Sequence, residues 1–167
     1  MTVSIALRPY LPSDAEALAL IYQAAILELT GDDYSERQQE EWAAEADDVD
    51  EFSVSLASML TLIAVEKGEA IGFASLKGAD HVEMLFVHPS AARRGVGSAL
   101  LDALERIAGA RGAKALTTEA SDTSQPLFAR RGYQPVRRIT TAIGDEWFGT
   151  TTMTKKLAPV EPAGTLQ

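Results

Sequence analysis

The segment Arg93-Arg94-Gly95-Val96-Gly97-Ser98 has the composition of an anion-binding turn. Gly95 and Gly97 have no side chains, so the main chain can approach a ligand closely at both positions. A strongly amphipathic pattern follows directly. The N–H groups of this turn therefore open a helix, whose dipole adds positive potential. Arg93 and Arg94 add formal positive charge. Together these features predict a site for a diphosphate.

Two common nucleotide motifs do not match this turn. A phosphate loop of nucleotide hydrolases needs Gly-Lys-Ser/Thr, whereas Ser98 and Ala99 follow Gly97. The dinucleotide fingerprint needs a third glycine, and Leu100 stands there. Glu119, at the end of the next predicted strand, would still suit a ribose-binding acid. A dinucleotide-binding oxidoreductase therefore stays open as an alternative.

Two carboxylates near the turn are candidates for proton transfer. Glu83 lies in an otherwise apolar predicted strand, where alternation places it on the same face as Leu85 and Val87. Apolar surroundings raise the pKa of a carboxyl group toward the range of a useful general base. Glu119 is the second candidate base. The alternative interpretation is that Glu83 pairs with a neighbouring arginine or is solvated.

Several other residues have both a structural and a functional interpretation. His88 can titrate, but its place before Pro89 favours a structural role. Ser121 and Ser124 can contact a ligand or cap a helix. Three aromatic residues among the acids of the early helices can anchor the core or line a pocket for a cationic or apolar amine; they are Tyr34, Trp42 and Phe52.

Hydrophobic periodicity predicts an α/β (α+β) fold with a mixed, mostly antiparallel central sheet and helices on both faces. The helix after the motif allows the strand that follows it to lie parallel to the preceding one. We predict one domain over residues 1–157 and a loose tail over 158–167. The predicted strands are 3–8, 60–66, 70–77, 81–87, 115–119, 133–143 and 149–157, and the predicted helices are 13–29, 35–46, 52–57, 96–107 and 127–131.

Pairs of side chains three residues apart predict how three of these helices begin. A hydroxyl or carboxylate at the first position and a Glu or Gln at the second form a capping box. The pairs are Ser13 with Glu16, Ser35 with Gln38, and Asp122 with Gln125.

Composition and charge exclude several classes of site. The chain of 167 residues has no cysteine and two histidines, so disulfides, a cysteine nucleophile and a multi-histidine metal centre are excluded, and we predict no metal. The net charge is −9, and residues 28–51 hold eleven acids beside Arg37 alone. This acidity argues against nucleic acid as a partner and suits a cationic substrate. No secretory signal or membrane span is evident, so we expect a cytoplasmic protein.

The stretch Leu85-Phe86-Val87-His88-Pro89, followed by Arg94-Gly95-Val96-Gly97-Ser98-Ala99-Leu100-Leu101, resembles the central motif of the GNAT acyl-CoA-dependent N-acetyltransferases. The order of predicted elements resembles that family over nearly the whole chain. The resemblance implies that main-chain groups of Leu85, Phe86 and Val87 pair with the pantetheine of acetyl-CoA. It also implies that residues 93–98 hold its diphosphate.

Two positions depart from the family pattern. Ala92 stands where members usually have Gln or Arg, and Phe128 stands where many have a tyrosine that protonates the departing thiolate. Phenylalanine has no proton to give. Tyr133 is the nearest phenol in the sequence, so we take it as a candidate acid, with a core position as the alternative. The thiolate can also depart without an acid.

The sequence thus predicts an N-acetyltransferase that moves acetyl from acetyl-CoA to a primary amine by direct attack in a ternary complex. The amine can be a small cationic molecule, a protein N-terminus or a lysine. A non-catalytic acyl-CoA-binding or regulatory module is the alternative that Phe128 favours. The oligomeric state is left open between a monomer and a homodimer.

Overall fold

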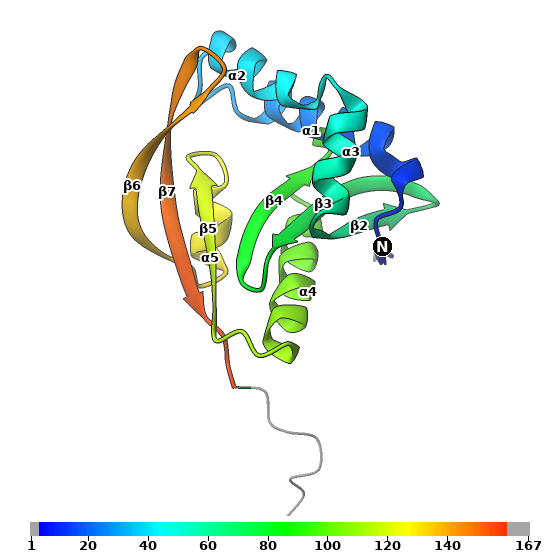
Figure 1. Cartoon of the computed structure of the whole chain (residues 1–167), viewed down its shortest axis with the longest axis vertical. Coiled ribbons are helices and arrows are strands. Elements are labelled where there is room, and N and C mark those ends of the chain that lie inside the picture. Colours follow the sequence, from blue (N-terminus) through cyan, green and yellow to red (C-terminus); the bar gives the residue numbers. More distant parts are fainter. Residues whose placement is uncertain (1–3, 160–167) are drawn as a thin grey trace, which may run out of the picture.

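Seven strands form one sheet in the order β1-β2-β3-β4-β5-β7-β6 (Figure 1). The computed structural model describes residues 4–159. Within that range only β4 and β5 pair in parallel, and every other neighbouring pair is antiparallel. The predicted mixed, mostly antiparallel sheet is therefore confirmed. The strands are β1 Ala6–Pro9, β2 Leu60–Glu66, β3 Glu69–Lys77, β4 His81–Val87, β5 Ala115–Ser121, β6 Gln134–Ile143 and β7 Glu146–Lys156.

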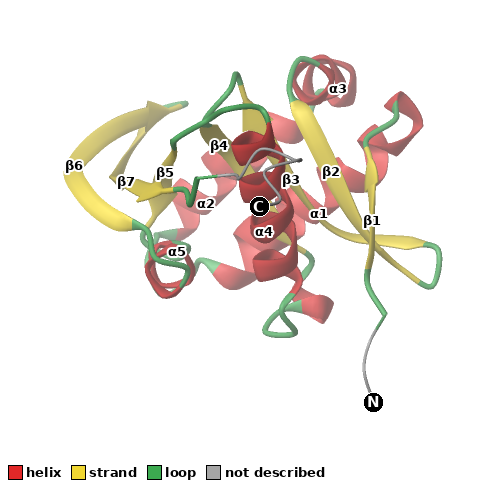
Figure 2. Cartoon of the chain, turned by 90° about the horizontal axis from the view of Figure 1, so that it is seen from below, coloured by secondary structure: helices red, strands yellow, loops and turns green. Residues whose placement is uncertain are grey.

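Helices cover both faces of this sheet, as predicted (Figure 2). On one face α4 packs with α5, and Leu100, Leu104 and Phe128 belong to the same buried cluster. On the other face α1 and α3 pack over Ile63 and Phe73. Helix α2 contacts α1 and β7. The helices are α1 Ala15–Leu29, α2 Glu36–Ala43, α3 Val49–Ala57, α4 Val96–Ala110 and α5 Gln125–Arg130.

The structure confirms one of the three predicted capping boxes. Ser35 Oγ accepts from the Gln38 N–H at 3.2 Å, and Gln38 Oε1 accepts from the Ser35 N–H at 2.9 Å. The box predicted at Ser13 is wrong, because Asp14 accepts from the Leu11 N–H and α1 begins only at Ala15.

The box predicted at Asp122 is also wrong, because Arg138 occupies that carboxylate. The start of α5 is held instead by Ser121, whose Oγ accepts from the Ser124 N–H at 3.1 Å. Other boundaries move by a few residues. Helix α3 begins at Val49 behind an Asp48 cap, and β7 begins at Glu146. Residue 3 of the predicted first strand and residues 160–167 of the predicted tail lie outside the described residues.

A β-bulge at Glu83 changes the alternation of β4. Leu76 of β3 lies opposite Val82, and Ser75 lies opposite Met84, so Glu83 is the extra residue. Beyond the bulge Leu85 packs toward α4, and Met84 packs toward α1. The prediction that simple alternation puts Glu83 on the face of Leu85 and Val87 is therefore wrong. The charge of Glu83 acts instead on Tyr22 of α1.

Two leucines of the long helices test how much the α4 face contributes to stability. Leu104 is 0% exposed, whereas Leu20 is 62% exposed. Leu104→Ala should lower the free energy of unfolding by about 2–5 kcal/mol, because it leaves a cavity in the core. Leu20→Ala should change it by less than about 0.5 kcal/mol. Chemical denaturation of both variants measures the difference, and equal losses would contradict this assignment of the core.

Candidate active site

Strands β4 and β5 part soon after they pair. Their register contains only His81 opposite Thr117 and Val82 opposite Thr118, although β4 continues to Val87 and β5 to Ser121. Beyond Val82, the edge of β4 that faces β5 therefore has no strand partner. Main-chain N–H and C=O groups there are available to a ligand. Leu85, Phe86 and Val87, the three residues predicted to hold a pantetheine chain, all lie in this part of β4.

A cavity of about 340 Å³ lies at this fork. Its walls include six aromatic side chains, namely Tyr22, Tyr34, Trp42, Phe86, Phe128 and Phe148. Its carboxylates are Glu45, Glu83 and Glu119. The Thr150 hydroxyl also lines it, is buried, and has no hydrogen-bond partner among residues 4–159. A mostly apolar enclosure with a few convergent polar groups is typical of a small-molecule site.

The predicted anion-binding turn leads from β4 into α4. Gly95 is the N-cap of α4 with φ +83°, a left-handed conformation that favours glycine. Arg93 also has a positive φ, of +63°. Gly97 packs tightly, because a Cβ there would lie 3.1 Å from the Leu127 side chain of α5. The turn thus presents the first N–H groups of a four-turn helix at the open end of the fork.

The two arginines of the turn have different surroundings. Arg94 forms an ion pair with Glu66 at the end of β2. The Arg93 side chain is exposed. Sequence reasoning did not find Glu66, because the contact joins the turn before α4 to the end of β2, which is distant in the chain. The side-chain charge of Arg94 is thus partly compensated, and the main-chain groups of the turn carry more of the positive potential.

Glu83 is held by His81. The imidazole Nε2 lies 3.3 Å from Glu83 Oε2, and a hydrogen bond of 2.8 Å joins Nδ1 to Thr117 Oγ1. The hydrogen bond from His81 lowers the pKa of Glu83 more than partial burial raises it, and the charge of Lys77 lowers it further. The predicted rise in the pKa of Glu83 is therefore wrong. Glu83 does line the cavity, as a carboxylate that is ionised at neutral pH.

The other two carboxylates differ from Glu83 in their surroundings. Glu119 accepts a bifurcated hydrogen bond from the Thr152 hydroxyl, at 2.9 and 2.8 Å. Glu45 follows α2 in the short 3-10 turn Ala44–Ala46. Burial, and secondarily the charge of Glu83, raises the pKa of Glu45. The sequence did not distinguish Glu45 from the other acids of residues 28–51, because no local pattern marks it.

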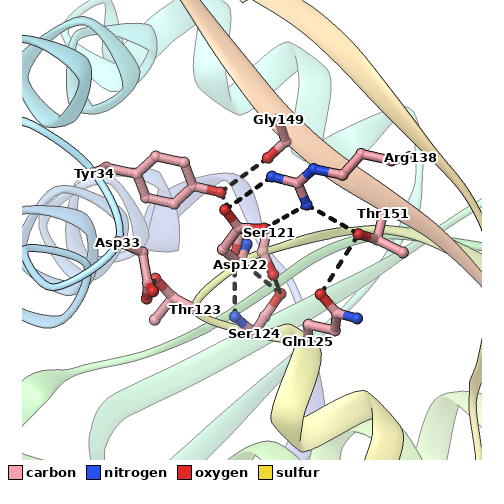
Figure 3. Close-up of polar contacts among 10 residues, drawn as sticks. All are labelled: Asp33, Tyr34, Ser121, Asp122, Thr123, Ser124, Gln125, Arg138, Gly149 and Thr151. Atoms are coloured by element: carbon pink, nitrogen blue, oxygen red, sulfur yellow. Dashed lines mark hydrogen bonds and ion pairs between the residues drawn. The ribbon is translucent and has the colours of Figure 1, made fainter.

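A polar network fixes the loop between β5 and α5 beside the cavity (Figure 3). The Tyr34 hydroxyl accepts from the Asp122 N–H at 2.8 Å and donates to the Gly149 carbonyl at 3.2 Å. Arg138 of β6 binds the Asp122 carboxylate through both terminal nitrogens. The loop after α1, the loop after β5 and the β6–β7 hairpin are thereby joined. Burial raises the pKa of Tyr34, so its hydroxyl stays protonated.

Comparison with known proteins identifies this arrangement. A model of the acetyltransferase (GNAT) domain matches residues 30–157. The chain belongs to the GNAT acetyltransferase family. It is 33% identical over 147 residues to the uncharacterized N-acetyltransferase YafP of Escherichia coli K12. The matched region covers 87% of this chain and 91% of YafP. Members of this family are acyltransferases. The comparison therefore favours the predicted acyltransferase over a non-catalytic module and over an oxidoreductase.

Solved GNAT structures have the same fold. A GCN5-related N-acetyltransferase from Rhodopseudomonas palustris is 55% identical, with a TM-score of 0.92 over 94% of this chain and 99% of that chain. The PaiA N-acetyltransferase of Thermoplasma acidophilum is 20% identical, with a TM-score of 0.76 over 92% of this chain and 99% of PaiA. No helix within residues 4–159 of this acetyltransferase has the length and apolar character of a membrane span.

Tyr133 lies outside the cavity, packed against Phe128, which lines it. Tyr133 is buried against Phe128, with ring centroids 5.1 Å apart, and its hydroxyl donates to Glu105 of α4 at 3.2 Å. Phe128 lines the cavity, whereas Tyr133 does not. Burial and the Glu105 charge raise the pKa of Tyr133. The structure therefore assigns Tyr133 to the core and does not support the predicted acid. Ser121 and Ser124 line the cavity, and His88 holds its own turn through Ser90.

Removing the imidazole should change the titration of Glu83. In His81→Ala the pKa of Glu83 should rise, because the hydrogen bond that favours its ionised form is lost. Carbon NMR of the side-chain carboxyl, assigned with Glu83→Gln, measures the shift. His88→Ala, which removes the other histidine, is the control and should leave Glu83 unchanged. An unchanged Glu83 titration in His81→Ala would contradict the contact.

Proposed function

We propose that this acetyltransferase moves the acetyl group of acetyl-CoA to a primary amine, by direct attack while both substrates are bound. The observation that carries this proposal is the early end of the β4–β5 pairing beside the N-terminus of α4. A fork of unpaired main-chain groups suits an amide-bearing chain such as pantetheine. A helix N-terminus next to the fork suits the diphosphate. The acceptor side of the cavity is acidic, as an amine site should be.

The residues present fit acetyl-CoA in this position. Main-chain groups of Leu85, Phe86 and Val87 would pair with the pantetheine, and the turn 93–98 would hold the diphosphate through its N–H groups. Val96 and Ser98 contribute N–H groups of the first helical turn, which have no intrahelical partner. Ala92, where family members usually have Gln or Arg, still has its main-chain N–H, so this departure removes no main-chain donor. PaiA was solved with coenzyme A, and YncA of Salmonella typhimurium, with a TM-score of 0.64 and 20% identity, was solved with acetyl-CoA.

Glu83 is the proposed proton acceptor. Amines with a pKa near ~10 are mostly protonated at neutral pH and must lose a proton before they attack. Glu83 is ionised, lines the cavity and stands at the base of the fork. His81 orients its carboxylate, and Thr117 orients the imidazole. Glu119 lies across the fork on β5, fixed by Thr152, and is the second candidate base.

Acetyl-CoA supplies the activated thioester carbonyl, and the protein stabilises charge on its oxygen. A main-chain N–H at the unpaired end of β4 near Val87 can donate to that oxygen. The fork positions both substrates, which supplies much of the remaining acceleration. Phe128 cannot donate a proton, and Tyr133 lies outside the cavity. We therefore propose that the weakly basic thiolate leaves without a phenolic acid and is protonated by solvent.

Replacing Gly95 tests the anion-binding turn. Gly95→Val should weaken coenzyme A binding by at least about tenfold in calorimetry, because the residue cannot keep φ +83° without strain. Gly112→Val is a matched control. Gly112 has φ +96° at the far end of α4, and no atom lies within 4 Å of its Cβ position either. Equal binding by the two variants, with equal unfolding temperatures, would contradict the proposed diphosphate site.

Replacing Glu83 tests the proton acceptor. Glu83→Gln should lower kcat by roughly 100-fold or more, which is the range of general-base contributions. Coenzyme A affinity should stay within about twofold, since Glu83 lies at the acceptor side. Thiol release with a panel of primary amines gives kcat, and calorimetry gives affinity. Exposed Glu69→Gln is the control. Wild-type activity in Glu83→Gln would remove Glu83 from the mechanism.

A further inference from the structure

The cavity contains more negative charge than acetyl transfer to a simple amine requires. Glu45, Glu83 and Glu119 all line it, and no lysine or arginine is among its lining residues. Glu83 is held by His81, and Glu119 is held by Thr152. Glu45 has no hydrogen-bond or ion-pair partner within the part of the chain that the structure describes. One carboxylate of the cavity thus lacks a counterpart.

Glu45 and Glu83 act on each other and on the same phenol. Burial is the main cause of the raised pKa of Glu45 and of Tyr22. The charge of Glu83 raises the pKa of Glu45 further, and both carboxylates raise the pKa of Tyr22 further. Tyr22 lines the cavity with them. The two carboxylates therefore repel each other, and because both residues are partly exposed, solvent screens a part of that repulsion. A ligand with one positive charge leaves one of them uncompensated, whereas a ligand with two compensates both.

Aromatic rings line the space around the two carboxylates. Trp42 lies one helical turn before Glu45, with its ring 6.2 Å from that of Phe86 and 5.9 Å from that of Phe148. Tyr22 packs on Phe86 at 4.5 Å. Such walls suit methylene groups, and their faces also attract ammonium groups. The buried Thr150 hydroxyl, which has no partner in residues 4–159, adds one more group that a ligand can bind.

The acceptor side of the cavity is enclosed by the β6–β7 hairpin. In Figure 1 this hairpin reaches α2, and its contacts include the first turn of that helix. Gln38 donates to the Trp147 carbonyl at 2.7 Å, and Arg37 pairs with Glu146 at 3.3 Å. Thr141, Ile143 and Phe148 of the hairpin line the cavity itself. A lid of this kind favours a small acceptor over a folded protein surface.

We propose that the acceptor is a small aliphatic diamine, with one amine at Glu83 and the other, which does not react, paired as an ammonium with Glu45. This inference rests on the proposed function. The reacting ammonium releases one proton before attack and a second as the amide forms. The C–N bond forms as the C–S bond breaks, and Glu83 takes up a proton. One proton ends on the coenzyme A thiol and the other in solvent. The second ammonium keeps its charge throughout.

A matched set of substrates tests the second charge. 1,4-Diaminobutane, 1-aminobutane and 4-amino-1-butanol have the same carbon chain and differ at one end, and diamines of two to six carbons vary the spacing. The wild-type protein should give kcat/KM at least about 30-fold higher for the best diamine than for the monoamine and the amino alcohol. Nα-acetyl-lysine amide represents a protein lysine and should behave as the monoamine does.

Glu45→Gln separates this inference from the proposed function. It should lower kcat/KM for the best diamine by at least about tenfold and for 1-aminobutane by less than about threefold. Exposed Glu40→Gln on α2, the helix that precedes Glu45, is the control and should change neither. Equal losses for both substrates, no preference for diamines, or the lysine amide as the best acceptor would each overturn the inference while acetyl transfer stands. Coenzyme A binding without acetyl transfer to any amine would overturn the proposed function itself.

Discussion

The early separation of β4 and β5 is the constraint on which the rest of the site depends. Two parallel strands with unsatisfied main-chain groups would ordinarily continue to pair, since buried N–H and C=O groups without partners are costly. Here the pairing stops after Val82 and Thr118. Beyond that point the strands have different neighbours. Met84 and Phe86 pack in the cluster under α1, and the end of β5 is held by the network around Tyr34. The open edge of β4 is thus built into the packing.

The Tyr34 network also joins the two halves of the cavity. Tyr34 belongs to the loop after α1, Asp122 to the loop after β5, and Gly149 to β7. Thr123 donates to Asp33 at 2.7 Å and adds a second link between the same loops. Most of these groups are backbone or neutral hydroxyls, so the connection depends little on pH. These hydrogen bonds connect the loop after α1 to the β5 loop and to β7, and so link the walls on both sides of the fork.

Local sequence patterns predicted the elements well and the contacts between distant residues poorly. The strand, turn and helix around Gly95 and the mixed sheet followed from periodicity and glycine chemistry. The capping box at Ser35 was correct because both partners lie within one turn. Asp122 was misassigned because its true partner, Arg138, approaches from another strand. Glu83 was misjudged for two reasons: a bulge breaks the alternation, and His81 reverses the expected direction of its pKa. No local sequence pattern distinguished Glu45 from the other acids of residues 28–51.

The charges of the site are arranged along β4 with opposite sign at its two ends. The carboxylates lie near Glu83, where β4 leaves the paired region, and the N-terminus of α4 lies beyond Val87. A cation is favoured at the first end, and a diphosphate is favoured at the second. The carboxylates would repel a diphosphate, and the N-terminus of α4 would repel a cation. The Arg94–Glu66 pair keeps side-chain charge at the diphosphate end partly neutralised, so selection there rests mainly on main-chain N–H groups. In the proposed function, one strand therefore separates two substrates of opposite charge and brings their reacting atoms together at its middle.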